Sequence, residues 1–294
     1  MTSGGNNFRD FPEIVSTREI TTKIDKTSFS RPWPWADFLN GLNAAASIAH
    51  TLIRQSLCIL QVANKRCLYV CLSVGRLYVS HNLTDSVHVC ELAAAGGGGS
   101  WSRWKTDGSP WGLSVTPGTC YLLVTMRYAA CVDEFSPDGR RLRRIDLGRT
   151  GAFSPWHTVL LNGLSSQLVV GHGDKDDDRA RVALVRVLDG RAVVERWYGG
   201  QPGSDAHLLT RPQHLAVGGR GGTLAVVDVF NDRVVLLDDQ LHRVGVVAAP
   251  AVDRDAGWLA SRTCWVGRRL CVAEVQSPDH HRLTAARLSL YDVR

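Results

Sequence analysis

The sequence lacks the cysteine patterns and the apolar leader that mark several common classes of protein. Its eight cysteines form no Cys-x-x-Cys pair, so the signatures of zinc fingers, RING domains and B-boxes are absent. Most of them stand beside Val, Leu or Tyr, where cysteine acts as a small buried hydrophobe. The first twenty residues have no apolar core, so we expect no secretory signal, a cytoplasmic location and reduced thiols.

A long uninterrupted apolar run is also missing. The longest apolar stretch, Leu42 to Ala63, is broken by polar residues, whereas a membrane span needs about 20 consecutive apolar residues. Its apolar residues recur three and four positions apart, which predicts an amphipathic helix near residues 42–60. We therefore expect no membrane partner. The interrupting residues are Asn43, His50, Arg54 and Gln55.

Charge of one sign is not concentrated in the chain. The net charge is +6, but from Thr106 onward there are 23 Lys and Arg against 21 Asp and Glu, so this part carries only +2. Binding to nucleic acid depends largely on cationic groups that neutralise phosphates. The composition therefore gives little support to a nucleic-acid-binding function, while 44% hydrophobic residues supply enough apolar surface for a core.

What the sequence does contain is a repeat. Its three clearest copies open on a proline and an apolar strand, followed by a Gly-rich turn, a second strand, a polar hairpin, a third strand, another turn and a fourth strand. The clearest copies are Ser109–Leu147, Ser154–Trp197 and Arg211–Val247. A copy in which the pattern is less well preserved covers Trp258–Arg294, and Cys71–Leu92 is the middle of another. Four short strands in about 40 to 45 residues are typical of a propeller blade.

We therefore predict an all-β protein, a β-propeller of four-stranded antiparallel blades. Five blades are recognisable and six are expected. The weak strand pattern between Phe11 and Ile24 leaves three alternatives open, namely a degenerate sixth blade there, a ring closed with five blades, or an N-terminal segment that is not native to the fold. The predicted division is a partly disordered N-terminal extension over residues 1–64, containing the helix near 42–60, and a propeller over residues 65–294.

One blade carries a more specific pattern. The segment YGGQPGSDAHLLTRPQHLAV, followed by LAVVDVFNDRVVLLD, resembles the NHL repeat, with its proline before the first strand and its Asp-x-x-Asn-x-Arg-Val hairpin. Asp228, Asn231 and Arg233 match that hairpin, where a structural role is expected. The resemblance implies a propeller, typically six-bladed, like those with which tripartite-motif NHL proteins hold protein or RNA partners. The zinc modules of that family are absent from this sequence.

Two histidines are candidates for a site in the central channel. His157 and His214 each stand two residues after a blade-opening proline, so they should begin innermost strands and meet near the axis. Such a pair could bind zinc or transfer protons, as in peptidylglycine amidating lyases, which this arrangement resembles. The preceding blade has Gly112 at this place and no third ligand is evident. We therefore expect hydrogen-bonding roles, and neither metal nor cofactor.

Two charged clusters are further candidates. Four aspartates between Asp174 and Asp178 could bind Ca²⁺, but the glycine and closing glutamate of an EF-hand loop are missing, so a solvated hairpin is the simpler interpretation. Four arginines between Arg140 and Arg144 could bind phosphate. On the outer edge of a blade, however, such charges also prevent edge-to-edge pairing.

Tryptophan and arginine at the blade openings are the candidates for partner binding. Trp111 and Trp156 align, and Arg127 and Arg211 should lie near the channel mouth. Exposed, such residues could anchor a peptide or stack a base, although packing between blades is the commoner use. We expect a non-catalytic scaffold that binds a protein or peptide through the channel face. The alternatives are single-stranded RNA binding through that face and a metal-dependent lyase or hydrolase centred on the channel.

Overall fold

The computed structural model describes most of the repeat region and one N-terminal segment. The described residues are 15–22, 70–73, 75–91, 100–151, 154–161, 166–173, 179–200, 203–205, 207–218, 222–248, 258–276 and 285–293. The expected helix near 42–60 and the four-aspartate loop lie outside these residues, so both stay predictions. Within the described ranges, no helix is long and apolar enough to cross a membrane.

The described chain is almost entirely β-strand. The first ten strands are β1 (Val15–Thr22), β2 (Val70–Ser73), β3 (Arg76–His81), β4 (Ser86–Glu91), β5 (Ser100–Lys105), β6 (Pro110–Val115), β7 (Leu122–Met126), β8 (Cys131–Phe135), β9 (Arg141–Asp146) and β10 (Pro155–Leu160). The other ten are β11 (Gln167–His172), β12 (Arg181–Leu188), β13 (Arg191–Gly199), β14 (Pro212–Gly218), β15 (Thr223–Asp228), β16 (Arg233–Leu237), β17 (Arg243–Ala248), β18 (Trp258–Val266), β19 (Arg269–Gln276) and β20 (Ala285–Asp292).

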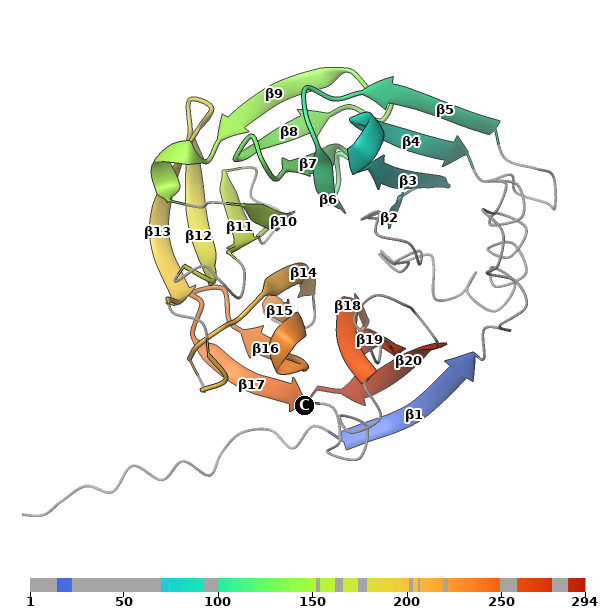
Figure 1. Cartoon of the computed structure of the whole chain (residues 1–294), viewed down its shortest axis with the longest axis vertical. Coiled ribbons are helices and arrows are strands. Elements are labelled where there is room, and N and C mark those ends of the chain that lie inside the picture. The colour runs from blue at the N-terminus through green and yellow to red at the C-terminus, as the bar shows by residue number, and fades with distance from the viewer. Residues whose placement is uncertain are drawn as a thin grey trace, which may run out of the picture.

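These strands form antiparallel units of four that surround a common centre (Figure 1). Three sheets have four strands, in the orders β2-β3-β4-β5, β14-β15-β16-β17 and β1-β20-β19-β18. The fourth has eight, because β6–β9 and β10–β13 are joined by one parallel pair, Arg191 with Asp146. The predicted all-β, propeller-like architecture is therefore confirmed. Six blades stay a prediction, since the described residues supply five such units.

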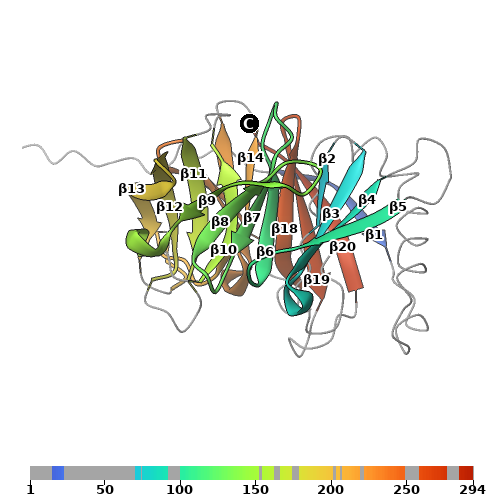
Figure 2. The ribbon, with the colours of Figure 1, turned by 90° about the horizontal axis from the view of Figure 1, so that it is seen from above.

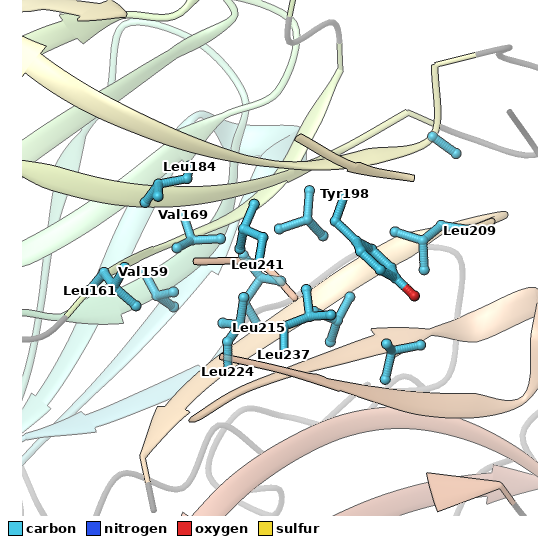
Figure 3. Packing of buried hydrophobic residues seen from close by; sticks show 14 residues of the cluster. Val159, Leu161, Val169, Leu184, Tyr198, Leu209, Leu215, Leu224, Leu237 and Leu241 are labelled. Carbon is cyan, nitrogen blue, oxygen red and sulfur yellow. The ribbon is translucent and has the colours of Figure 1, made fainter. Parts of the chain in front are cut away.

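Apolar side chains between neighbouring units hold the arrangement together. Strands buried on both faces show long runs of buried residues, as in β10 and β16. Figure 3 shows one such layer, in which Val169 and Leu184 of one unit pack with Leu215 and Leu237 of the next. Seen edge-on in Figure 2, the strands run between two faces of the ring, so the connecting loops gather on those faces.

The segment β1 is the outermost strand of the sheet formed by the end of the chain. It pairs antiparallel with β20, from Val15 opposite Asp292 to Thr22 opposite Ala286. This strand coincides with the weak strand pattern seen between Phe11 and Ile24. The sheet thus combines the two distant parts of the sequence, as Figure 1 shows for the blue and red strands. The predicted division at residue 64 stays a prediction.

Candidate functional site

The innermost strand of four successive units has the same local irregularity. The pairing register shifts within residues 110–113 of β6, 155–157 of β10, 212–214 of β14 and 260–262 of β18. A β-bulge of this kind re-aims the following side chain. Gly112, His157, His214 and Arg262 therefore occupy equivalent positions, and we call these four residues the axial row.

His157 ties together the inner strands of three units. The Leu215 N–H of β14 donates a hydrogen bond to its Nδ1 (3.1 Å), so Nδ1 is unprotonated. Its Nε2 therefore carries the proton and donates to the Leu113 carbonyl of β6 (2.9 Å). Burial lowers the pKa of His157 to about 4, so the ring is neutral near pH 7.

His214 repeats this arrangement only in part. Its ring is stacked on that of His157, with centroids 4.5 Å apart and planes inclined by 12°. Its Nδ1 accepts a long hydrogen bond from the Thr263 N–H (3.5 Å), while its buried Nε2 contacts no hydrogen-bonding group among the described residues. Burial, then His157, then Arg262 lower its pKa well below the usual value. Arg262 is itself only 3% exposed, so the axial row ends in a buried cation.

This bonding makes a metal centre on the histidines unfavourable. A metal at His157 would have to displace one of two backbone partners, because both ring nitrogens are occupied. Arg262 adds a positive charge beside the pair, which opposes a cation further. Within the described part of the chain, no three His, Cys, Asp or Glu side chains are grouped as metal ligands.

Trp111, Trp156, Arg127 and Arg211 form one continuous stack on the face where the innermost strands begin, which we call the opening face. The Trp111 and Trp156 rings meet edge-to-face at 5.1 Å. The Arg127 guanidinium carbon lies 3.5 Å from the Trp156 ring centroid, and that of Arg211 lies 4.9 Å from it. Cation–π contacts of this kind stabilise neighbouring units against one another. The two tryptophans are only 6% and 3% exposed, so they pack between units and offer no ring face to a base.

The exposed aromatic group on the opening face was not recognised in the sequence. Tyr128 is 73% exposed and touches Trp111 edge-on at 6.4 Å. It lies in a four-residue loop between β7 and β8, and loops of the same length join β3 to β4 and β15 to β16. The second residue of each loop is apolar: Leu83, 61% exposed, Tyr128, and Phe230, over which Arg211 lies at 4.1 Å.

The last residue of each of these loops has the same left-handed backbone conformation. Asp85, Ala130 and Asp232 all have a positive φ, of 45°, 45° and 47°. This left-handed geometry ends the short turn and returns the chain into the third strand. The repeated conformation places Leu83, Tyr128 and Phe230 equivalently. We call these three residues the loop triad. A signal for it exists in the sequence, namely an apolar residue at the same offset in three hairpins.

The hairpin motif of the third clear repeat holds the segment before β14 in place through hydrogen bonds. Its residues are Asp228, Asn231 and Arg233. Asp228 accepts hydrogen bonds from the Thr210 and Arg211 amides (2.9 and 3.0 Å) and from Asn231 Nδ2 (2.6 Å). The Arg233 guanidinium donates to Asp228 and to the backbone carbonyls of Ser204, Asp205 and Leu208. The three side chains thus order the loop that leads to the opening face.

The arginines between Arg140 and Arg144 are largely engaged with nearby carboxylates. Arg144 pairs with Asp133 through two bonds of 2.7 Å, Arg143 pairs with Glu134, and Arg141 pairs with Asp107. The hydrogen bond with Asp133 raises the pKa of Arg144 further. Arg141, Arg143 and Arg144 lie on β9, the outer strand of its unit, and their carboxylate partners favour the edge role over phosphate binding.

Comparisons with known proteins support the fold alone. No family model and no curated protein matches the chain. A protein of unknown function from Bacteroides caccae is 12% identical with a TM-score of 0.50, over 72% of this chain and 73% of its own. A streptogramin B lyase is 11% identical (TM-score 0.49, 78% of each chain), and a putative 6-phosphogluconolactonase from Bacteroides fragilis is 13% identical (TM-score 0.45, 60% of this chain and 53% of its own). The class that fold and comparisons define is a β-propeller-like protein.

Proposed function

We propose that this chain is a non-catalytic propeller scaffold of the NHL type, six-bladed and cytoplasmic, that binds a protein or peptide through its opening face. The observation that carries the proposal is the exposure of Tyr128. This large aromatic side chain is 73% exposed and packs edge-on against the buried Trp111. Tyrosine and arginine are enriched in protein–protein interfaces, and Arg127 lies next to Tyr128 with its guanidinium carbon 5.7 Å from the tyrosine ring centroid. Tyrosine on a rigid support is also typical of the residues that dominate binding energy.

The rest of the loop triad extends this surface over three units. Leu83 stands on the neighbouring unit, and Phe230 lies beyond Trp156 on the far side of the cation–π stack. Two positive charges lie beside the aromatic residues of the triad, because Arg127 is next to Tyr128 and Arg211 lies over Phe230. Trp111 and Trp156 pack edge-to-face next to this surface. Because the surface is ordered before a partner binds, little conformational entropy is lost on binding.

RNA binding through the same face is the less favoured alternative. Base stacking needs exposed aromatic faces, and Trp111 and Trp156 are both nearly inaccessible. The metal-dependent alternative is less favoured still, because both nitrogens of His157 are held by backbone groups. Neither argument concerns Tyr128, which is 73% exposed.

The full chain, immobilised at low density and exposed to native lysate with and without nuclease, tests the class of partner. The proposal predicts that a defined set of proteins is retained equally in both arms. Retention that disappears with nuclease would replace it with the RNA alternative. Elemental analysis that finds about one zinc per purified chain, lost in a His157→Ala, His214→Ala variant, would support the metal-dependent one.

A further inference from the structure

Two cysteines face each other directly across β18 and β19, the two inner strands of the sheet formed by the end of the chain. Cys264 of β18 and Cys271 of β19 are register partners, and the hairpin between them turns at Gly267 and Arg268. Both side chains are buried, at 3% and 4% exposure, and both are free thiols. Opposed residues in an antiparallel pair have Cα atoms about 4.5–5.5 Å apart, within the range of about 4.4–6.8 Å that a disulfide spans.

The direction of its pKa shift sets Cys271 apart from Cys90 and Cys131, which are also buried. A hydrogen bond from the Cys264 thiol lowers the pKa of Cys271 although burial opposes it. Burial instead raises the pKa of Cys90, and that of Cys131 to about 11. The thiolate is the form of cysteine that reacts with oxidants. Cys271 therefore combines higher thiolate character with a second sulfur at the right place to complete a bond.

We propose that Cys264 and Cys271 form an oxidation site that a hydroperoxide converts to a cross-strand disulfide. The Cys271 thiolate attacks one oxygen of hydrogen peroxide, and the O–O bond breaks. Hydroxide departs and becomes water on taking up a proton, and Cys271 is now a sulfenic acid. The Cys264 thiol then attacks that sulfur, so the S–S bond forms, the S–O bond breaks and water departs. Two thiols lose two electrons and two protons in total, and one peroxide becomes two molecules of water.

The position of the pair connects oxidation to the axial row. Thr263, next to Cys264, donates its N–H to His214 and its hydroxyl to the Cys271 carbonyl (3.5 and 3.0 Å). A disulfide here constrains the strand that contacts His214. Cross-links between directly opposed strands are tight, and strained disulfides are the more easily reduced ones. The bond should therefore be reversible by a monothiol such as glutathione. This inference is independent of the proposed function.

Peptide mapping of the oxidised full chain tests the site. The chain is treated with hydrogen peroxide, free thiols are blocked with iodoacetamide, and trypsin is added without reductant. Trypsin cleaves after Arg262, Arg268 and Arg269, so the two cysteines lie on separate peptides. We expect those peptides joined, lighter than their sum by two hydrogen atoms, and separated again by glutathione. In Cys264→Ser the reaction should stop at a sulfenic acid on Cys271 that dimedone traps.

Cys90→Ser is the matched control and should keep the cross-link. In the folded wild-type chain Cys271 should be oxidised at least ten times faster than Cys131, since thiolate fraction governs the rate. The proposal is overturned if Cys90 or Cys131 is oxidised first, or if no joined peptide forms at peroxide concentrations that leave the circular dichroism spectrum unchanged. Because this readout uses the wild-type chain, it holds even where a serine variant fails to fold.

Discussion

The rings of His157 and His214 lie parallel at 4.5 Å although the residues are 57 positions apart and belong to different units. Their neutral state is what makes the contact favourable, because two imidazolium ions at this separation would repel each other in a buried site. Together with Gly112 and Arg262 they form a row in which Gly112, His157 and His214 each pack against, or bond to, the next inner strand. The row thus serves first to hold the ring together.

Stability should fall in acid because of His157. Its folded-state pKa of about 4 lies below the unfolded value of 6.5, so the unfolded chain gains a proton first as the pH drops. The stabilisation is complete above about pH 6.5 and should decrease by about 3 kcal/mol on approaching pH 4. His214 acts in the same direction. Urea unfolding at several pH values should show a flatter dependence in His157→Gln than in the exposed control His207→Gln.

Gly112→Ala should destabilise the protein strongly. A Cβ at this position would lie 2.5 Å from the Trp156 carbonyl oxygen and 2.6 Å from His157 Cδ2, so the inner strands of two units must separate. We expect a loss of about 1–3 kcal/mol, as for overpacking in other cores. Gly200→Ala is the control, since nothing lies within 4 Å of its added Cβ. Equal melting temperatures for the two variants would show that the axial row is not tightly packed.

Asp228→Ala should cost more stability than any surface carboxylate. Asp228 is fully buried and its removal leaves the Arg233 guanidinium without its carboxylate partner. Breaking a buried pair in this way costs about 3–5 kcal/mol. The control is Asp107→Ala, at an exposed pair with Arg141, which should leave the melting temperature unchanged. Chemical denaturation of both variants decides whether the hairpin motif is structural.

RNA binding should be weak and sensitive to salt. The region from Thr106 onward has a net charge of only +2, and each neutralised phosphate contributes a salt-dependent term. With random RNA pools at two salt concentrations, we expect a Kd of roughly micromolar or weaker at physiological salt. Sequence-selected nanomolar binding that disappears in Tyr128→Ser would mean that the loop triad recognises RNA.

Much of the architecture could be predicted from the sequence because prolines and glycines recur at equivalent positions in several blades. The prolines at 110, 155 and 212 each open an innermost strand, and Gly75, Gly118 and Gly222 lie in turns between first and second strands. The same alignment placed His157 and His214 in equivalent positions. Arg262 was missed, since its strand has no opening proline and only the bulge in pairing shows its equivalence.

Other features depend on contacts that a pattern does not encode. The segment VSTREITT has only a weak strand pattern in the sequence, and its place in a sheet depends on pairing with β20 at the other end of the chain. Trp111 and Trp156 were candidates for partner contact, yet their burial depends on the cation–π stack formed with arginines from other loops. The exposed member, Tyr128, is distinguished from them by its place in a turn.

The central claim is that the loop triad binds a protein, and comparison of three immobilised chains tests it most directly. Wild type, Tyr128→Ser and Leu188→Ser are exposed to the same nuclease-treated lysate, and retained proteins are quantified by mass spectrometry. Leu188 is a fair control because it is 53% exposed and ends β12, whose other end starts at the opening face. We predict that Tyr128→Ser loses at least tenfold of the wild-type signal while Leu188→Ser keeps it. Equal retention by all three chains would contradict the account.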